Sequence, residues 1–62
     1  MAWCVVERPD GVDEIDIGSM SFDGGSLILF SDAERRSPKA AYGPGGWLHW
    51  RWKETGIGEV RA

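Results

Sequence analysis

The chain has 62 residues, and its seven lysines and arginines against ten aspartates and glutamates give a formal net charge of −3. This length allows a single small domain over residues 1–62 and leaves no room for separate catalytic and substrate domains. The acidic balance disfavours general nucleic-acid binding by bulk charge, and no apolar run is long enough to span a membrane. At 42% hydrophobic residues, the chain is too apolar for a disordered tail of this charge.

One cysteine and one histidine limit the chemistry of the chain. A disulfide within the chain is impossible, and a zinc site lacks ligands, so we expect neither a metal nor another cofactor. We expect Cys4 to be a buried small hydrophobe. The lone cysteine and the lack of a secretory signal at residues 1–6 predict a cytoplasmic protein. Four tryptophans, two phenylalanines and one tyrosine predict a dense aromatic core, and homo-oligomerisation is the other route to stability.

Short apolar runs separated by glycine, aspartate and proline predict β structure from the start of the chain. The first expected strand is 2–7, and it ends at the turn residues 9–11. In the second run, 12–22, alternation places Asp13, Ile15 and Ile17 on one face of the strand and Met20 and Phe22 on the opposite face. A bulge at Gly18 would bring both sets to one side.

The middle of the chain contains the clearest turn and the longest irregular stretch. Residues 23–25, Asp-Gly-Gly, give the strongest hairpin signal. The following run, 26–31, is apolar on both faces, which is typical of a central strand. Residues 32–46 predict a long loop, in which the capping-box spacing indicates one helical turn near 32–36.

Two further strands complete the prediction, a clear one at 47–53 and a weaker one at 57–61. The expected class is all-β, or β-rich α+β. The expected architecture is a small antiparallel twisted sheet or small barrel of four to five strands, with one helical turn near 32–36.

Alternation along strand 47–53 separates two faces. One face is apolar and is expected in the core: Leu48, Trp50 and Trp52. The other combines an aromatic ring with three cationic side chains: Trp47, His49, Arg51 and Lys53. This row predicts either a solvated strand face, a contact with a protein partner, or a track along a phosphate backbone on which Trp47 stacks.

Two other groups of side chains are candidate binding residues. The long loop carries residue types that dominate many interfaces, so we assign its Arg35, Arg36 and Tyr42 to the same partner surface. An acidic cluster predicts a negatively charged surface: Asp10, Asp13, Glu14 and Asp16. Its spacing matches no calcium loop, so the interpretations are a solvated strand edge or an imitation of phosphates.

Charge is unevenly divided along the chain. Residues 1–34 hold eight carboxylates and one arginine, a balance of −7, and residues 35–62 hold six bases and two carboxylates, a balance of +4. The two halves could form separate faces or interleave in a sheet, and we favour interleaving.

Catalysis is not expected, because the chain lacks a nucleophile motif and the length for a water-excluding pocket. We predict a small non-catalytic protein–protein interaction module that acts by surface occupancy. In general character it resembles inhibitor and accessory proteins of bacteriophages and mobile elements, such as anti-CRISPR proteins. The alternatives are a small β-barrel nucleic-acid binder that uses strand 47–53, and a structural subunit of a larger assembly.

Overall fold

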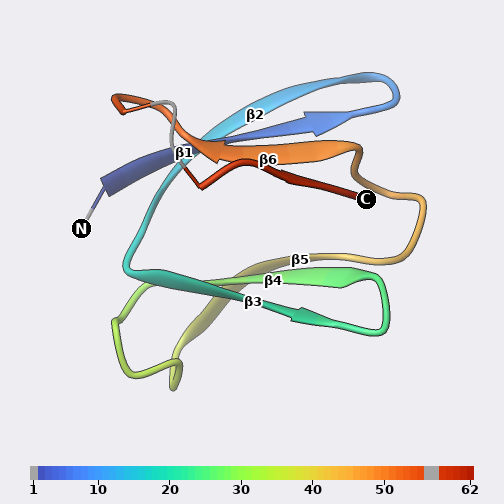
Figure 1. Cartoon of the computed structure of the whole chain (residues 1–62). Coiled ribbons are helices and arrows are strands. Elements are labelled where there is room, and N and C mark those ends of the chain that lie inside the picture. Colours follow the sequence, from blue (N-terminus) through green and yellow to red (C-terminus); the bar gives the residue numbers. More distant parts are fainter. Residues whose placement is uncertain (1, 56–57) are drawn as a thin grey trace.

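The computed structural model describes residues 2–55 and 58–62, and these form two antiparallel β-sheets that pack face to face (Figure 1). The first sheet has the order β2-β1-β6-β7: β1 Ala2–Arg8, β2 Gly11–Ile17, β6 His49–Trp52 and β7 Val60–Arg61. The second has the order β3-β4-β5: β3 Ser19–Asp23, β4 Ser26–Phe30 and β5 Pro38–Tyr42. The described part contains no helix, and therefore no helix that is long and apolar enough to cross a membrane. The all-β prediction is confirmed, but the sheets do not close into a barrel.

Both predicted hairpin turns are present. Strands β1 and β2 pair along their whole length, from Ala2 opposite Ile17 to Arg8 opposite Gly11. Strands β3 and β4 are joined by Gly24 and Gly25, whose φ angles are +58° and +88°. Two consecutive positive φ angles are the requirement of a type I′ turn, and glycine adopts them without strain.

The run predicted as one strand over 12–22 is divided at Gly18. The chain passes from the first sheet to the second at this residue, and the Gly18 amide donates a hydrogen bond of 2.8 Å to the Phe30 carbonyl. A Cβ on Gly18 would lie 2.6 Å from the main-chain carbon of Asp32. The predicted change of phase therefore occurs, but it joins two strands of different sheets.

The expected long loop over 32–46 is corrected by the structure, because it contains strand β5. The predicted helical turn near 32–36 is also absent. The Asp32 carboxylate accepts hydrogen bonds from the amides of Arg36 and Ser37, at 3.0 and 3.2 Å, and Arg35 has a φ of +62°. These bonds close a turn, so the aspartate side chain stabilises a non-helical conformation instead of starting a helix.

The core lies between the sheets and combines aliphatic and aromatic side chains. Its most buried members are Cys4, Val6, Ile17, Leu27, Leu29, Trp47 and Trp50. The Trp50 and Trp52 rings meet edge to face, with centroids 4.9 Å apart. Seven strands exceed the four to five predicted. Of the expected strand 57–61 the structure shows β7, while residue 57 lies outside the described residues.

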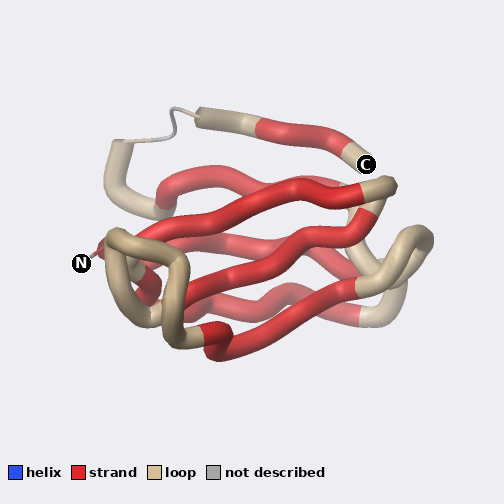
Figure 2. Tube along the Cα trace, turned by 90° about the horizontal axis from the view of Figure 1, so that it is seen from below, coloured by secondary structure: helices blue, strands red, loops and turns tan. Residues whose placement is uncertain are grey.

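The two sheets are held together at one side by edge strands β2 and β5. The Tyr42 hydroxyl donates a hydrogen bond of 2.8 Å to Asp13 Oδ2, and Lys39 Nζ donates one of 2.7 Å to the Asp16 carbonyl. At the opposite side the edge strands are β3 and β7, and Figure 2 shows the strand that ends at C lying at the edge of the molecule. The sandwich therefore has one closed side, and at its other side β7 extends beyond the three-stranded sheet.

Candidate functional site

The outer face of the four-stranded sheet carries most of the cationic row that the sequence predicted. In the strand register Glu7 lies opposite His49, and Val5 lies between Glu14 and Arg51. Because side chains alternate along each strand, all five point away from the core. Val5 is nevertheless buried, because the longer charged side chains on both neighbouring strands flank it.

His49 is the centre of this face and is only 6% exposed. Its Nε2 lies 2.9 Å from Glu59 Oε1, and its Nδ1 lies 3.2 Å from Glu7 Oε2. The first contact has hydrogen-bond geometry, whereas the contact of Nδ1 with its carboxylate does not. His49 is therefore a buried connection between β1, β6 and the segment before β7.

The two other cations of the row are also paired with carboxylates. Arg51 Nη1 lies 2.9 Å from Glu7 Oε2, and Lys53 Nζ lies 2.7 Å from Glu14 Oε1. Each pair joins the basic half of the chain to the acidic half, so the prediction that the halves interleave is confirmed. Such exposed pairs typically contribute about 0–1 kcal/mol each to stability.

A polar hollow of about 440 Å³ opens on this face beside His49. Its lining combines cations, carboxylates and one apolar side chain: Glu7, Leu48, His49, Arg51, Glu59 and Arg61. Leu48 is 50% exposed, although it was predicted to lie in the core. The alternation predicted from residue 47 fails because β6 begins only at His49. An exposed leucine therefore lies at the rim of a hollow with both signs of charge.

Trp47 lies in the core, where Leu48 was predicted to lie. Its side chain is 2% exposed, stacks on Phe22 with ring centroids 5.5 Å apart, and donates from Nε1 to the Gly25 carbonyl at 2.9 Å. The expectation of an exposed stacking ring is therefore wrong. The ring instead fastens the segment before β6 to the β3–β4 hairpin.

The loop residues assigned to the same partner surface lie elsewhere. Arg35 and Arg36 are in the connection between β4 and β5 of the other sheet. Tyr42 points into the closed side of the sandwich, where burial, and then its hydrogen bond to Asp13, raise its pKa to about 12. No hydrogen bond or ion pair joins these three residues to the row within the described chain.

The predicted acidic cluster is divided between two environments. Asp13 faces inward, and its hydrogen bonds from Tyr42 and Arg8 hold its pKa below the usual range. Asp10 pairs with Arg8 at 2.7 Å, whereas Glu14 is on the outer face. Asp16 accepts Lys39 at its carbonyl and has a buried Oδ1 without a hydrogen-bond partner. Residues 2–55 and 58–62 contain no cluster of three metal-ligating side chains.

Cys4 is fully buried in the core, as predicted, and burial raises the pKa of its thiol. A raised pKa leaves less thiolate, the reactive form of cysteine. The side chain therefore serves packing.

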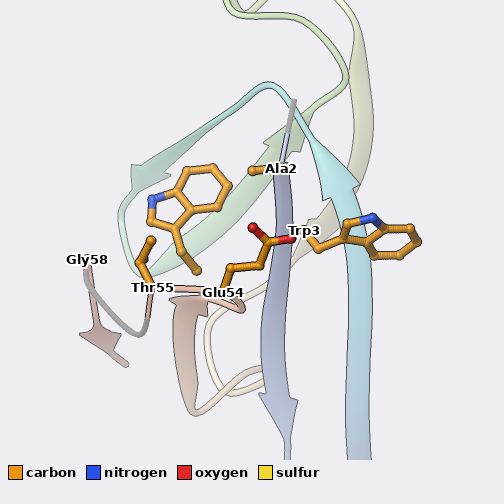
Figure 3. A pocket seen from close by; sticks show the side chains of 6 residues that line it. Ala2, Trp3, Glu54, Thr55 and Gly58 are labelled. Carbon is orange, nitrogen blue, oxygen red and sulfur yellow. The ribbon is translucent and has the colours of Figure 1, made fainter.

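Sequence reasoning missed Trp3, which is 47% exposed. In Figure 3 its indole projects on the opposite side of β1 from Ala2. A second hollow of about 460 Å³, mostly apolar, lies at this end of the molecule and is lined by Ala2, Trp3, Trp52, Glu54, Thr55 and Gly58. Alternation from buried Cys4 could have placed Trp3 on the outer face, had the core phase of β1 been known.

Comparison with known proteins adds no family to this geometry. No protein-family model matches the sequence, and searches of curated proteins and of solved structures find no significant match.

Proposed function

We propose that this chain is a small non-catalytic protein–protein interaction module that binds its partner through the outer face of the four-stranded sheet. The observation that carries the proposal is the pair of exposed apolar side chains on that face, Trp3 on β1 and Leu48 before β6, with the paired charges between them. Tryptophan and arginine are enriched among the residues that dominate interface energies.

The charged residues between these anchors suit the specificity of a protein interface. Glu7 already holds both His49 and Arg51, so the side chains are positioned before a partner arrives. Preorganised charges align a partner and reject wrong ones, and apolar anchors supply most of the affinity. The same pairing does not favour nucleic acid, because Arg51 and Lys53 each lie against a carboxylate that repels phosphate.

The proposal is tested by affinity capture with a charge introduced on one face or the other. Leu48→Asp places a carboxylate at the proposed rim, and Ala41→Asp introduces the same charge at an exposed position of β5 in the other sheet. Tagged chains are incubated with lysate of the source organism, with and without nuclease, and the bound proteins are identified by mass spectrometry.

We expect the wild-type chain and Ala41→Asp to retain the same protein in both conditions, and Leu48→Asp to lose it. Equal retention by both variants would remove the outer face from the interface. Retention that disappears with nuclease would replace the proposal with contact through nucleic acid.

A further inference from the structure

The two sheets of the sandwich are unequal, and the difference lies at one side. Contacts from β5 to Asp13 and Asp16 align the sheets at the β2 edge. Because four strands face three, β7 extends beyond β3 at the other edge, and Figure 2 shows the strand that ends at C lying at the edge of the molecule. Val60 of β7 and Trp52 at the end of the neighbouring β6 face inward and are only partly buried. The three-stranded sheet therefore lacks a strand beneath β7.

The edge of β3 has main-chain groups available for such a strand. Asp23 and Ser26 flank the two-residue turn, so they form a hydrogen-bonded pair of the antiparallel ladder. Because hydrogen-bonded pairs alternate with non-hydrogen-bonded ones, the main-chain groups of Ser21 and Ser19 also bond to β4. The N–H and C=O groups of Met20 and Phe22 therefore point away from β4. No hydrogen bond within the described residues satisfies them. This edge can therefore form four hydrogen bonds with another strand, donating two from its N–H groups and accepting two at its C=O groups.

The edge of β3 also lacks the features that prevent strands from pairing. On the other side, Lys39 bonds the Asp16 carbonyl on the β2 edge, and β5 begins with Pro38. Such lysines and prolines block an edge. The outward side chains of Ser19 and Ser21 are small and neutral, and the Phe22 ring is 41% exposed at this edge. Of the three longer edge strands, β3 is the one open to pairing.

We propose that the β3 edge binds an extended segment of a partner protein, which becomes the fourth strand of the three-stranded sheet. Alternate apolar side chains of this segment would lie beneath β7, against Val60, with Trp52 and Phe22 beside them. Exposed Asp23 and Glu54 have no ion-pair partner within the described chain, so the segment should carry basic residues at its ends. Strand addition of this kind draws affinity from main-chain bonds and specificity from alternate side chains.

A second copy of the chain does not fit this position. Antiparallel pairing of β3 with β3 requires a two-fold axis beside the strand, and that axis would place the overhanging β7 of both copies in the same space. The surface is separate from the outer face that carries the proposed function, so each can fail without the other.

The test uses a synthetic peptide in which valine and threonine alternate between terminal lysines, added to the isotope-labelled full chain. We expect hydrogen exchange at the Met20 and Phe22 amides to slow by about tenfold at saturation, since both amides gain acceptors. A glutamate-ended version should bind more weakly. A version with proline at every second position, which lacks donors, should not bind.

Matched lysine substitutions complete the test. Phe22→Lys introduces an edge charge on β3 and should abolish peptide binding, whereas Val12→Lys changes an even more exposed position on the β2 edge and should leave peptide binding unchanged. Near-ultraviolet circular dichroism checks that both variants are folded. If Phe22→Lys does not fold, the comparison of the valine–threonine peptide with the proline peptide on the wild-type chain tests the proposal instead. Three results would each overturn the proposal. The peptide could leave exchange at the Met20 and Phe22 amides unchanged, or it could protect β2 instead. The third is slow exchange at the Met20 and Phe22 amides in a dimer of the chain without peptide.

Discussion

The 2.8 Å hydrogen bond from the Tyr42 hydroxyl to Asp13 explains why a carboxylate has the phase of a core residue in β2. Asp13 lies in phase with Ile15 and Ile17 but at the end of the sandwich, where Arg8 Nε also donates to it at 2.9 Å. A half-buried carboxylate with two donors is tolerated, and without them its burial would destabilise the fold.

Tyr42 is the only tyrosine, so its ionisation can be followed directly by ultraviolet absorbance. Its pKa in the folded chain is about 12, whereas the unfolded chain should titrate near 10. Between these values the unfolded state releases a proton that the folded state keeps, so stability is full below pH 10 and falls as the pH rises toward 12. A tyrosinate midpoint near 10 in the folded chain would contradict the buried hydrogen bond.

Asp13 should affect stability at the acid end. Its lowered pKa means that the folded state favours the charged form, so the stabilisation is present above the unfolded value and is lost as the pH falls through the folded one. We expect Asp13→Asn to be less stable than the wild-type chain at neutral pH and to approach it as the pH falls below about 4. Urea unfolding at several pH values measures this difference, and a constant gap would exclude the ionised carboxylate as its cause.

Two neighbouring residues should respond very differently to truncation. Trp47→Ala removes a buried ring, its stacking on Phe22 and its bond to Gly25, at a cost of about 3–5 kcal/mol. That is much of the roughly 3–9 kcal/mol expected for a chain of this length. Leu48→Ala truncates a half-exposed side chain and should cost less than about 1 kcal/mol. Denaturant unfolding compares them, and equal losses would contradict the assigned burial.

At the scale of elements, local patterns predicted the hairpins and missed the contacts between distant segments. The turns at 9–11 and 23–25 depend on glycine and neighbouring residues, so the sequence is sufficient for them. Strand β5 was missed because Pro38 and the following glycines suggest a loop, and its pairing with β4 supplies the stability. The capping box at 31–34 failed because the Asp32 carboxylate bonds two amides without a helix.

The passage between the sheets at Gly18 is the element most sensitive to a small change. Gly18→Ala would place Cβ 2.6 Å from the Asp32 main chain, so one of the two segments must shift, at a cost of roughly 1–3 kcal/mol. Gly43→Ala is the matched control, since nothing lies within 4 Å of its Cβ position and its φ is not positive. Thermal unfolding of both variants checks this. Equal melting temperatures would show that the close approach imposes no constraint.

At the scale of the whole molecule, the outer face of the four-stranded sheet exists only because distant strands meet. The sequence predicted His49, Arg51 and Lys53 on one face, which the structure confirms. It could not predict Glu7 and Glu14 beside them, because that depends on the strand order β2-β1-β6. Nor could alternation identify Leu48 as exposed and Trp47 as buried, because both precede the first paired residue of β6.

The most direct test of the proposed function is chemical-shift mapping of the labelled chain with the captured partner protein. We expect the amides of Trp3, Leu48 and Arg51, on or beside the outer face, to shift or broaden most, while those of β5 are unaffected. Perturbations confined to the three-stranded sheet, with these amides unchanged, would contradict the central claim that the outer face of the four-stranded sheet is the binding surface.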